Sequence, residues 1–408
     1  MEPFATNEFD RLLVAMLHSA ADISDLLFIA GKPPQVETHG LLEIYGAMPV
    51  LESSQVETFA RGVIKNQPKL LADLAERGSC DCSYALNGSR FRVNIYKQNG
   101  NFAMVMRRLP SEIPTMEVLK LPPSFHQVIQ EKNGLVFVTG GTGNGKTTTL
   151  AAMLGKINST LKSHVVTLED PIEFLHPHGL ATFSQREMGR DFFSFPDGLR
   201  AALRQSPKVI FIGEIRDRET MEIVLTASET GHIVYSTLHT ISAGQTINRV
   251  LGLFDKDEQQ QVRERLASTV RYIISQRLVP QKSGGRLLVT ELMGSSLRTR
   301  EAIEQGENEN RRLHEIIESG SNAGWHSFEQ SLLKAFEQDL ISEEVAMQYC
   351  GNRSVMRQRL DTAKSRGTGR LVGKLDKVAM FSTASAVPPP LEIPLPMADV
   401  PTKSKLRV

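Results

Sequence analysis

The chain has 408 residues, of which 40% are hydrophobic and 23% charged, and its 47 basic side chains are balanced by 46 acidic ones. That length predicts two or three domains, since a typical domain holds about 100 to 200 residues. The balanced charge argues against a polyanion such as nucleic acid as the main partner, and three cysteines are too few for a disulfide framework or a four-cysteine zinc site.

The first 110 residues predict a small α+β domain. Phe9, Leu12, Leu13, Met16 and Leu17 recur at the spacing of one helix face, so we expect an opening helix that packs against a core. Short apolar runs bounded by glycines follow this helix. The strands predicted from these runs cover residues 36–38, 41–45, 91–98 and 103–109.

A linker and a larger α/β domain are predicted next. Four prolines between residues 110 and 123 mark the linker, because proline removes a backbone donor and blocks regular structure. Buried-strand signals then alternate with helical segments, which is the pattern of a parallel sheet covered by helices. These strands are predicted at 135–139, 165–168, 209–212 and 233–237, and a further amphipathic helix at 257–276.

The segment from residue 363 onward predicts a disordered, mildly basic tail. It holds six of the chain's 20 prolines and eight basic against three acidic residues. We therefore divide the chain into an N-terminal α+β domain at 1–110, a linker at 111–123, an α/β domain at 124–362 and a tail at 363–408.

Nothing in the sequence predicts secretion or insertion into a membrane. Residues 1–10 carry no basic residue of the kind that begins a secretory signal, and no apolar run approaches the roughly 18 residues of a membrane span. The few, unevenly spaced cysteines fit a reducing compartment. We expect a cytoplasmic protein that meets a membrane only through partners.

The motif G-x-x-x-x-G-K-[ST] stands directly after the predicted strand at 135–139 and directly before a helical segment, which is the context this motif requires. Its backbone N–H groups and the helix N-terminus suit phosphate oxygens, Lys146 adds a full charge, and the Thr147 hydroxyl suits Mg²⁺. We predict that it binds ATP with Mg²⁺. The predicted ATP-binding residues are Gly140, Gly141, Thr142, Gly143, Asn144, Gly145, Lys146, Thr147 and Thr148.

Two carboxylates follow apolar strands and are candidates for the chemistry of hydrolysis. Glu214 ends the strand at 209–212, and Glu169 ends the strand at 165–168, with Asp170 next to it. Hydrolysis of a bound phosphate needs an acid that holds the metal and a group that positions water. We predict that Glu214 activates the water and that Glu169 binds Mg²⁺ through water, with Asp170 in reserve; by spacing alone, surface charge at the strand ends is an equal alternative.

His239 follows the fourth strand and so faces the same edge of the predicted sheet, although a single histidine at a strand end is more often structural. His232 lies at the opposite end of that strand. Arginines form two groups, and their fork-shaped guanidinium donors suit phosphate stabilisation across a subunit boundary, while most single arginines are solvated. The groups are Arg90, Arg92, Arg107 and Arg108, and Arg200, Arg204, Arg216 and Arg218.

With these motifs the sequence resembles the secretion ATPase superfamily, and most closely the type IV pilus retraction ATPases of the PilT and PilU group. The resemblance covers about residues 8 to 360. Beside the P-loop it rests on an aspartate box, a variant Walker B segment, a histidine box and two arginine segments of the N-terminal domain. These are residues 167–174, 213–217, 230–240, 91–94 and 107–110.

The resemblance implies roles for individual residues. Glu214 would be the catalytic carboxylate of the Walker B segment, and His239 would contact the γ-phosphate. Arg92 and Arg107 would bind ATP from the N-terminal domain. It also implies a PAS-like N-terminal domain joined to a RecA-like P-loop motor domain, in a ring of six with ATP between the domains.

In this family the domain motions act on an inner-membrane platform protein and return pilin subunits to the membrane. The resemblance therefore implies a homohexamer, or a mixed ring with a paralogue, that is cytoplasmic and peripheral at the inner membrane through the pilus machine. We expect no direct contact with nucleic acid.

Three other functions stay open. The first is an accessory, PilU-like ring partner or a catalytically weak member of mixed rings, because residues 296–300 match only part of the family's Ala-Ile-Arg-Asn-Leu segment. The second is a type II or type IV secretion system ATPase, since the motifs are shared. The third is a RecA-like nucleic-acid translocase, which would need a basic stripe that the balanced charge does not suggest.

Overall fold

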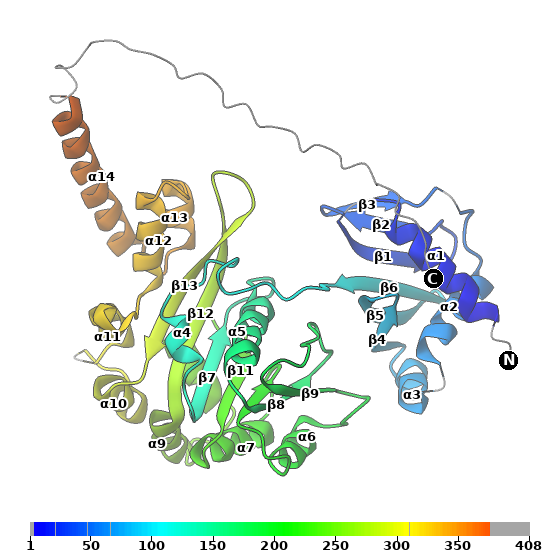
Figure 1. The fold of residues 1–408 in the computed structure, drawn as a ribbon, viewed down its shortest axis with the longest axis horizontal. Coiled ribbons are helices and arrows are strands. Elements are labelled where there is room, and N and C mark those ends of the chain that lie inside the picture. Colours follow the sequence, from blue (N-terminus) through cyan, green and yellow to red (C-terminus); the bar gives the residue numbers. More distant parts are fainter. Residues whose placement is uncertain (1–3, 21, 47, 66, 310, 376–408) are drawn as a thin grey trace, which may run out of the picture. The chain divides into compact units, whose positions relative to one another are not determined.

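The computed structural model describes residues 4–375, except residues 21, 47, 66 and 310 (Figure 1). Within that part of the chain, no helix combines the length and the apolar character that crossing a bilayer requires. The chain divides into two units, with the boundary after Arg357.

The N-terminal region folds as an antiparallel six-stranded sheet with helices, in the strand order β3-β2-β1-β6-β5-β4. Alternation of apolar and polar residues along the strands gives the sheet one apolar face, which packs on the helices. Phe9, Phe28 and Phe59 meet there, with Phe9 stacked on Phe59 at 4.8 Å between ring centroids. The elements are α1 (Phe4–Leu17), β1 (Ile23–Ile29), β2 (Gln35–Thr38), β3 (Leu41–Ile44), α2 (Ser53–Ile64), α3 (Pro68–Glu76), β4 (Ser79–Leu86), β5 (Ser89–Gln98) and β6 (Asn101–Leu109).

The predicted opening helix and the four predicted strands of this region are confirmed. Strands β1 and β4 were not predicted, because their apolar residues are interrupted by Asp25, Asp81 and other polar side chains that lie on the second face of the sheet. The α+β character of the region is confirmed, and its PAS-like identity stays a prediction.

The region after the linker is built on a seven-stranded sheet in the order β13-β12-β7-β11-β10-β8-β9, parallel except for β13. Its central strands β7, β10 and β11 are buried on both faces, as parallel strands covered by helices must be. The elements are α4 (Phe125–Val128), β7 (Gly134–Thr139), α5 (Lys146–Thr160), β8 (His164–Glu169), β9 (Thr182–Glu187), α6 (Phe195–Ala202), β10 (Val209–Ile212), α7 (Arg218–Glu229), β11 (Ile233–Leu238), α8 (Ala243–Leu251), α9 (Gln259–Thr269), β12 (Val270–Pro280) and β13 (Arg286–Gly294).

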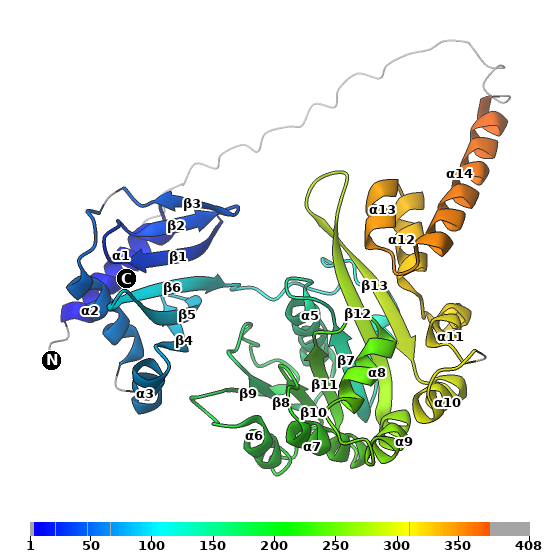
Figure 2. The ribbon, with the colours of Figure 1, turned by 180° about the vertical axis from the view of Figure 1, so that it is seen from behind.

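Alternate residues of each strand enter two cores. Leu135 and Phe137 of β7 pack with α7, α8 and α9, whereas Val136 and Val138 pack with α4 and α5. The ribbons show this arrangement: α5 lies in front of the sheet in Figure 1, and α8 lies in front of it in Figure 2, which shows the opposite side. The predicted doubly covered parallel sheet is confirmed.

Helices follow the sheet, all of them short except α14, and the single tryptophan of the chain lies among them. They are α10 (Leu297–Gln305), α11 (Leu313–Ser319), the 3-10 helix η1 (Ser321–Ala323), α12 (Phe328–Glu337), α13 (Glu343–Tyr349) and α14 (Arg353–Leu375). Trp325 is wedged between two glycines: a Cβ atom on Gly294 or on Gly320 would lie 2.3 Å from its indole ring. These two positions therefore require glycine for space.

Two predictions about element boundaries were wrong. The helix predicted at 257–276 ends at Thr269, and the residues from Val270 onward form β12, which pairs with β7. Val270, Ile273 and Ile274 fit a helical face and a buried strand equally well, and pairing in the sheet decides between the two. The predicted boundary of the disordered tail at residue 363 lies inside α14, which continues to Leu375; residues 376–408 lie outside the described part.

Candidate nucleotide site

The P-loop joins the carboxyl end of β7 to the first residue of α5, as the motif predicts. Gly143 and Gly145 have φ of 77° and 79°, values that L-residues with side chains seldom adopt. A Cβ atom on Gly140 would lie 2.7 Å from the carbonyl oxygen of Gln276 on β12, so only glycine fits against that strand. The loop leads directly into the N-terminus of α5, where anions bind.

Lys146 is held inside this loop. Its Nζ donates to the carbonyl oxygens of Gly140 at 2.9 Å and Gly141 at 3.2 Å. Burial lowers the pKa of Lys146, and the charges of Glu214 and Glu173 oppose that change. The lysine thus lies between the loop carbonyls and two acids, where a phosphate would find its positive charge.

Glu214 and His239 reach the same edge of the sheet as the P-loop. Strands β7, β11 and β10 are neighbours, and His239 and Glu214 follow β11 and β10. Glu214 Oε1 lies 3.6 Å from His239 Nε2, and its Oε2 accepts from Arg216 Nε at 2.9 Å. His232, at the other end of β11, lies 3.1 Å through Nδ1 from the Ala227 carbonyl oxygen, a local structural contact. The fold therefore brings together Lys146, Glu214 and His239.

Glu169 is the last residue of β8 and accepts hydrogen bonds inside the sheet. Its Oε1 accepts from Thr167 Oγ1 at 2.6 Å and from Gln185 Nε2 on β9 at 3.2 Å. Burial raises the pKa of Glu169 to about 7. Strand β8 is three places from β7 in the sheet, a distance of about 14 Å at the usual strand spacing. The metal role of Glu169 stays a prediction, and its carboxylate has internal partners in this structure.

Glu173 is the carboxylate that the sequence interpretation missed. It lies four residues after Glu169 in the same motif, and its charge acts on the pKa of Lys146 whereas that of Glu169 does not. Glu169 is the last residue of β8, whereas Glu173 lies in the loop that follows this strand. The sequence contains both glutamates, but it does not show that one ends a strand and the other lies in a loop.

Arginines 92 and 107 lie opposite each other in neighbouring strands of the N-terminal sheet. Like charges in that position destabilise a sheet, so each needs compensation. Arg107 Nε donates to Asp25 Oδ1 at 2.9 Å, and Arg92 Nε lies 4.0 Å from Asp81 Oδ1. Both side chains keep about half or more of their surface exposed, at 69% for Arg107 and 48% for Arg92, so an anion in solution can reach them.

The charge of Arg92 also affects the pKa of a carboxyl group in the larger domain. Burial raises the pKa of Asp170, while the charges of Arg216 and Arg92 oppose this change. Asp170 thus lies within the electrostatic reach of an arginine from the N-terminal domain. Arg108 and Arg90 are neighbours of this pair in sequence, and Arg90 contacts the larger domain through Glu187.

The arrangement fits phosphoryl transfer to water. A loop and helix N-terminus bind phosphates, a lysine supplies charge, and a carboxylate beside a histidine lies at the same edge of the sheet. A group of possible metal ligands, His314, Glu318 and Glu329, has ligand atoms within 4.8 Å of one another. Glu329 accepts from two backbone N–H groups and Glu318 from Ser327, so these acids have structural partners.

Comparison with known proteins agrees with this arrangement. Residues 87–347 match the family described as type II/IV secretion system protein. The type IV pilus retractation ATPase PilT of Pseudomonas aeruginosa is 39% identical over 79% of this chain and 93% of its own length. The type IV pilus ATPase PilU of the same organism is 36% identical over 86% of this chain and 90% of its own.

A solved structure is similar across both domains. The crystal structure of the pilus retraction motor PilT with bound ADP has a TM-score of 0.77 and 38% sequence identity, and the match covers 86% of this chain and 98% of that chain. The predicted mixed α/β fold of two parts is confirmed by this likeness.

Proposed function

The chain is an ATPase of the type II/IV secretion system protein family, and we propose that it is a motor that retracts type IV pili and so drives twitching motility. The observation that carries this proposal is the likeness to PilT along nearly the whole of that protein, its N-terminal domain included. A shared P-loop alone would support only nucleotide binding, whereas a likeness over both domains supports a shared use of domain motion.

The site supports a division of roles. Residues 140–148 hold the phosphates, with Lys146 turning from the loop carbonyls to the bound anion. Glu214 accepts a proton from the attacking water, and His239 contacts the γ-phosphate. Mg²⁺ would neutralise phosphate charge, held by Thr147 and by Glu173, to which we transfer the role first predicted for Glu169.

Assembly completes the proposed site. The exposed Arg92 and Arg107 lie on a charged sheet face that suits the phosphates of a neighbouring subunit, so a homohexamer, or a mixed ring with a paralogue, would place them in trans. The partner that receives the motion is an inner-membrane platform protein of the pilus machine. The motor would accordingly lie on the cytoplasmic side, bound to the membrane through that partner.

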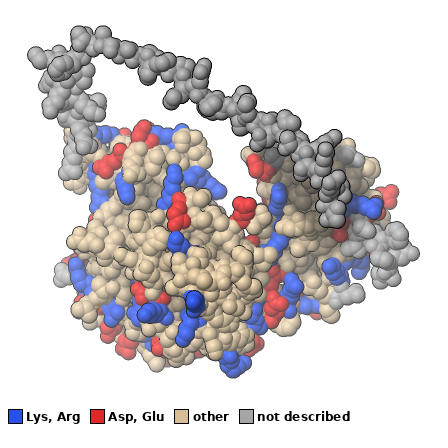
Figure 3. Space-filling model, in the orientation of Figure 1, with Lys and Arg blue, Asp and Glu red and all other residues tan. Residues whose placement is uncertain are grey.

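One observation favours a second candidate. The match to PilU covers 86% of this chain, against 79% for PilT, which is consistent with an accessory ring partner that resembles PilU. A secretion system ATPase shares the same family model. A nucleic-acid translocase has less support, since basic and acidic side chains are interspersed on the face seen in Figure 3.

The test is a count of surface pili, with twitching motility, in a strain that lacks the protein. We expect more pili and no motility, restored by the wild-type chain but not by Glu214→Gln or Lys146→Ala produced at the same level. Bald cells would make the protein an extension motor instead. Unchanged pili and motility would move the assignment to an accessory partner or a secretion ATPase. Deleting a paralogue in the same strain would then separate these two, because only the loss of an accessory partner should change pili or motility further.

A further inference from the structure

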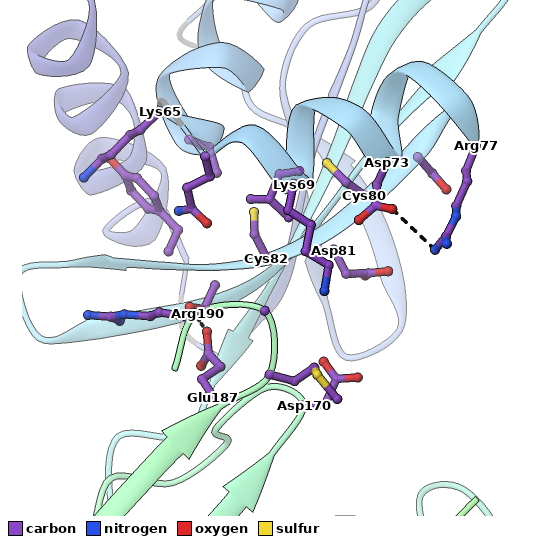
Figure 4. A pocket seen from close by; sticks show the side chains of 18 of the residues that line it. Lys65, Lys69, Asp73, Arg77, Cys80, Asp81, Cys82, Asp170, Glu187 and Arg190 are labelled. Atoms are coloured by element: carbon purple, nitrogen blue, oxygen red, sulfur yellow. Dashed lines mark hydrogen bonds and ion pairs between the residues drawn. The ribbon is translucent and has the colours of Figure 1, made fainter. Parts of the chain in front are cut away.

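Glu187, the last residue of β9, joins the two domains through one carboxylate. Its Oε1 accepts from Ser83 Oγ on β4 at 2.6 Å, and its Oε2 lies 3.8 Å from Arg90 Nη2 on β5. The same Oε2 accepts from the backbone N–H of Ile172 at 3.2 Å. Figure 4 shows Glu187 between the strands of the N-terminal domain and the loop that carries Asp170. The carboxylate therefore contacts the N-terminal domain and the aspartate-box loop at once.

The hydrogen bond from Ile172 to Glu187 lies one residue away from the proposed metal ligand Glu173. Ile172 is buried and directly precedes Glu173, the carboxylate that acts on Lys146. A shift of the Ile172 backbone thus moves Glu173 relative to the P-loop. Small displacements of such a residue matter, since misplacement of a reacting group by about 1 Å can lower turnover by about a hundredfold.

The contact is incompletely satisfied and adjoins a cavity. Arg90 Nη1 is buried and has no hydrogen-bond partner among the described atoms, and burial lowers the pKa of Arg90. A cavity of about 640 Å³ adjoins the contact, lined by Asp73, Arg77 and Asp81 on one side and by Arg190 on the other (Figure 4). The unpaired guanidinium nitrogen offsets part of the gain from the ion pair, and the cavity leaves room for these side chains to change position.

We propose that Glu187 is a positioning residue that transmits the position of the N-terminal domain to Glu173 through the backbone of Ile172. When the N-terminal domain is seated, Ser83 and Arg90 fix the carboxylate, which fixes the loop. When that domain moves, the carboxylate loses two of its three partners and the loop loosens. The inference rests on the proposed function of the site, in which Glu173 holds the metal.

The test compares variants on both sides of the contact in the full chain. Glu187→Ala removes the acceptor, and Ser83→Ala combined with Arg90→Met removes the N-terminal partners without touching the larger domain. Glu187→Gln is the conservative rescue, because its amide can accept from Ile172 and donate to Ser83. Glu229→Ala, which breaks a Glu–Arg pair with Arg265 away from the site, is the matched control.

Three readouts are needed: kcat and KM for ATP, the Kd of a fluorescent ADP analogue, and hydrogen exchange of backbone amides at 170–174. We expect Glu187→Ala and the double variant to lower kcat by about tenfold with Kd within about twofold, and to speed exchange at 170–174, while Glu187→Gln and the control stay within about threefold of the wild type.

Normal kcat and normal exchange in the double variant would overturn the proposal, because Glu187 would then anchor only its own loop. A weakened Kd with unchanged kcat in Glu187→Ala would overturn it as well. If the wild-type chain turned over no ATP, the proposed function would fail, while hydrogen exchange in the double variant would still decide whether the N-terminal contact reaches the loop.

Discussion

Replacing Glu169 with glutamine tests whether this buried acid is a metal ligand or an internal group of the sheet. The carboxyl titrates near 4.5 in an unfolded chain and near a pKa of about 7 in the folded protein, because it is fully buried. Between these values the folded state holds one more proton, so the free energy of unfolding falls as pH rises through this window. Below about pH 4.5 the carboxyl group is neutral in both the folded and the unfolded state, so it does not lower the free energy of unfolding.

The expected magnitude follows from the same two values. At about 1.4 kcal/mol for each pKa unit, the ionised carboxylate costs the folded protein about 3 kcal/mol at high pH, and about 2 kcal/mol of that cost arises between pH 5.5 and 8.5. Glutamine keeps an acceptor for Thr167 and Gln185 and does not titrate. Relative to the wild type, Glu169→Gln should therefore gain about 2 kcal/mol of stability between these two pH values.

The assay is urea unfolding of both proteins at each pH, followed by circular dichroism, in buffer with a chelator and no nucleotide. Comparing the two proteins at one pH cancels the contributions of all other groups. An equal difference at both pH values would refute the reasoning about burial. A wild type that gains stability over the variant at high pH would show that the protein stabilises the carboxylate, as a metal ligand requires.

Three further outcomes are expected. Glu214→Gln should bind ATP but hydrolyse it at least about a hundredfold more slowly in a phosphate-release assay, and near-normal turnover would remove the base from our mechanism. If Arg107 acts across a subunit boundary, mixing Arg107→Ala subunits with Glu214→Gln subunits should change ATPase activity non-additively, whereas simple dilution would contradict action in trans. Gly320→Ala should lower stability by about 2 kcal/mol or more in a thermal melt, because its Cβ would lie 2.3 Å from the Trp325 ring, while Gly62→Ala, which has open space in helix α2, should be neutral or stabilising.

Much of the architecture could be read from local patterns. The P-loop, the four strands around it and the position of Glu214 after β10 each depend on a short apolar run and the residues next to it, and the structure has them where the sequence predicts. The β12 strand could not be separated from the helix before it, because its apolar spacing fits both and only pairing with β7 decides.

The functional carboxylates show a different limit. In the sequence, Glu169 and Glu214 each follow an apolar run, yet in the structure Glu169 is the last residue of β8 whereas Glu214 lies beyond the end of β10, and the two carboxylates have different surroundings. Strand order decides this, because β10 is two places from β7 and β8 is three places away, and no local pattern contains that order. The role of Glu187 was equally hidden, since its partners at positions 83 and 172 are distant in sequence and meet only in the folded chain.

The two bonds from Lys146 to its own loop have a consequence for the direction of its charge. An ammonium group has three N–H donors. The Gly140 and Gly141 carbonyls occupy two of them, so the side chain is held in one position and a third donor remains for a phosphate oxygen. The lysine is therefore oriented by the loop itself, and little side-chain freedom is left to lose when a nucleotide binds.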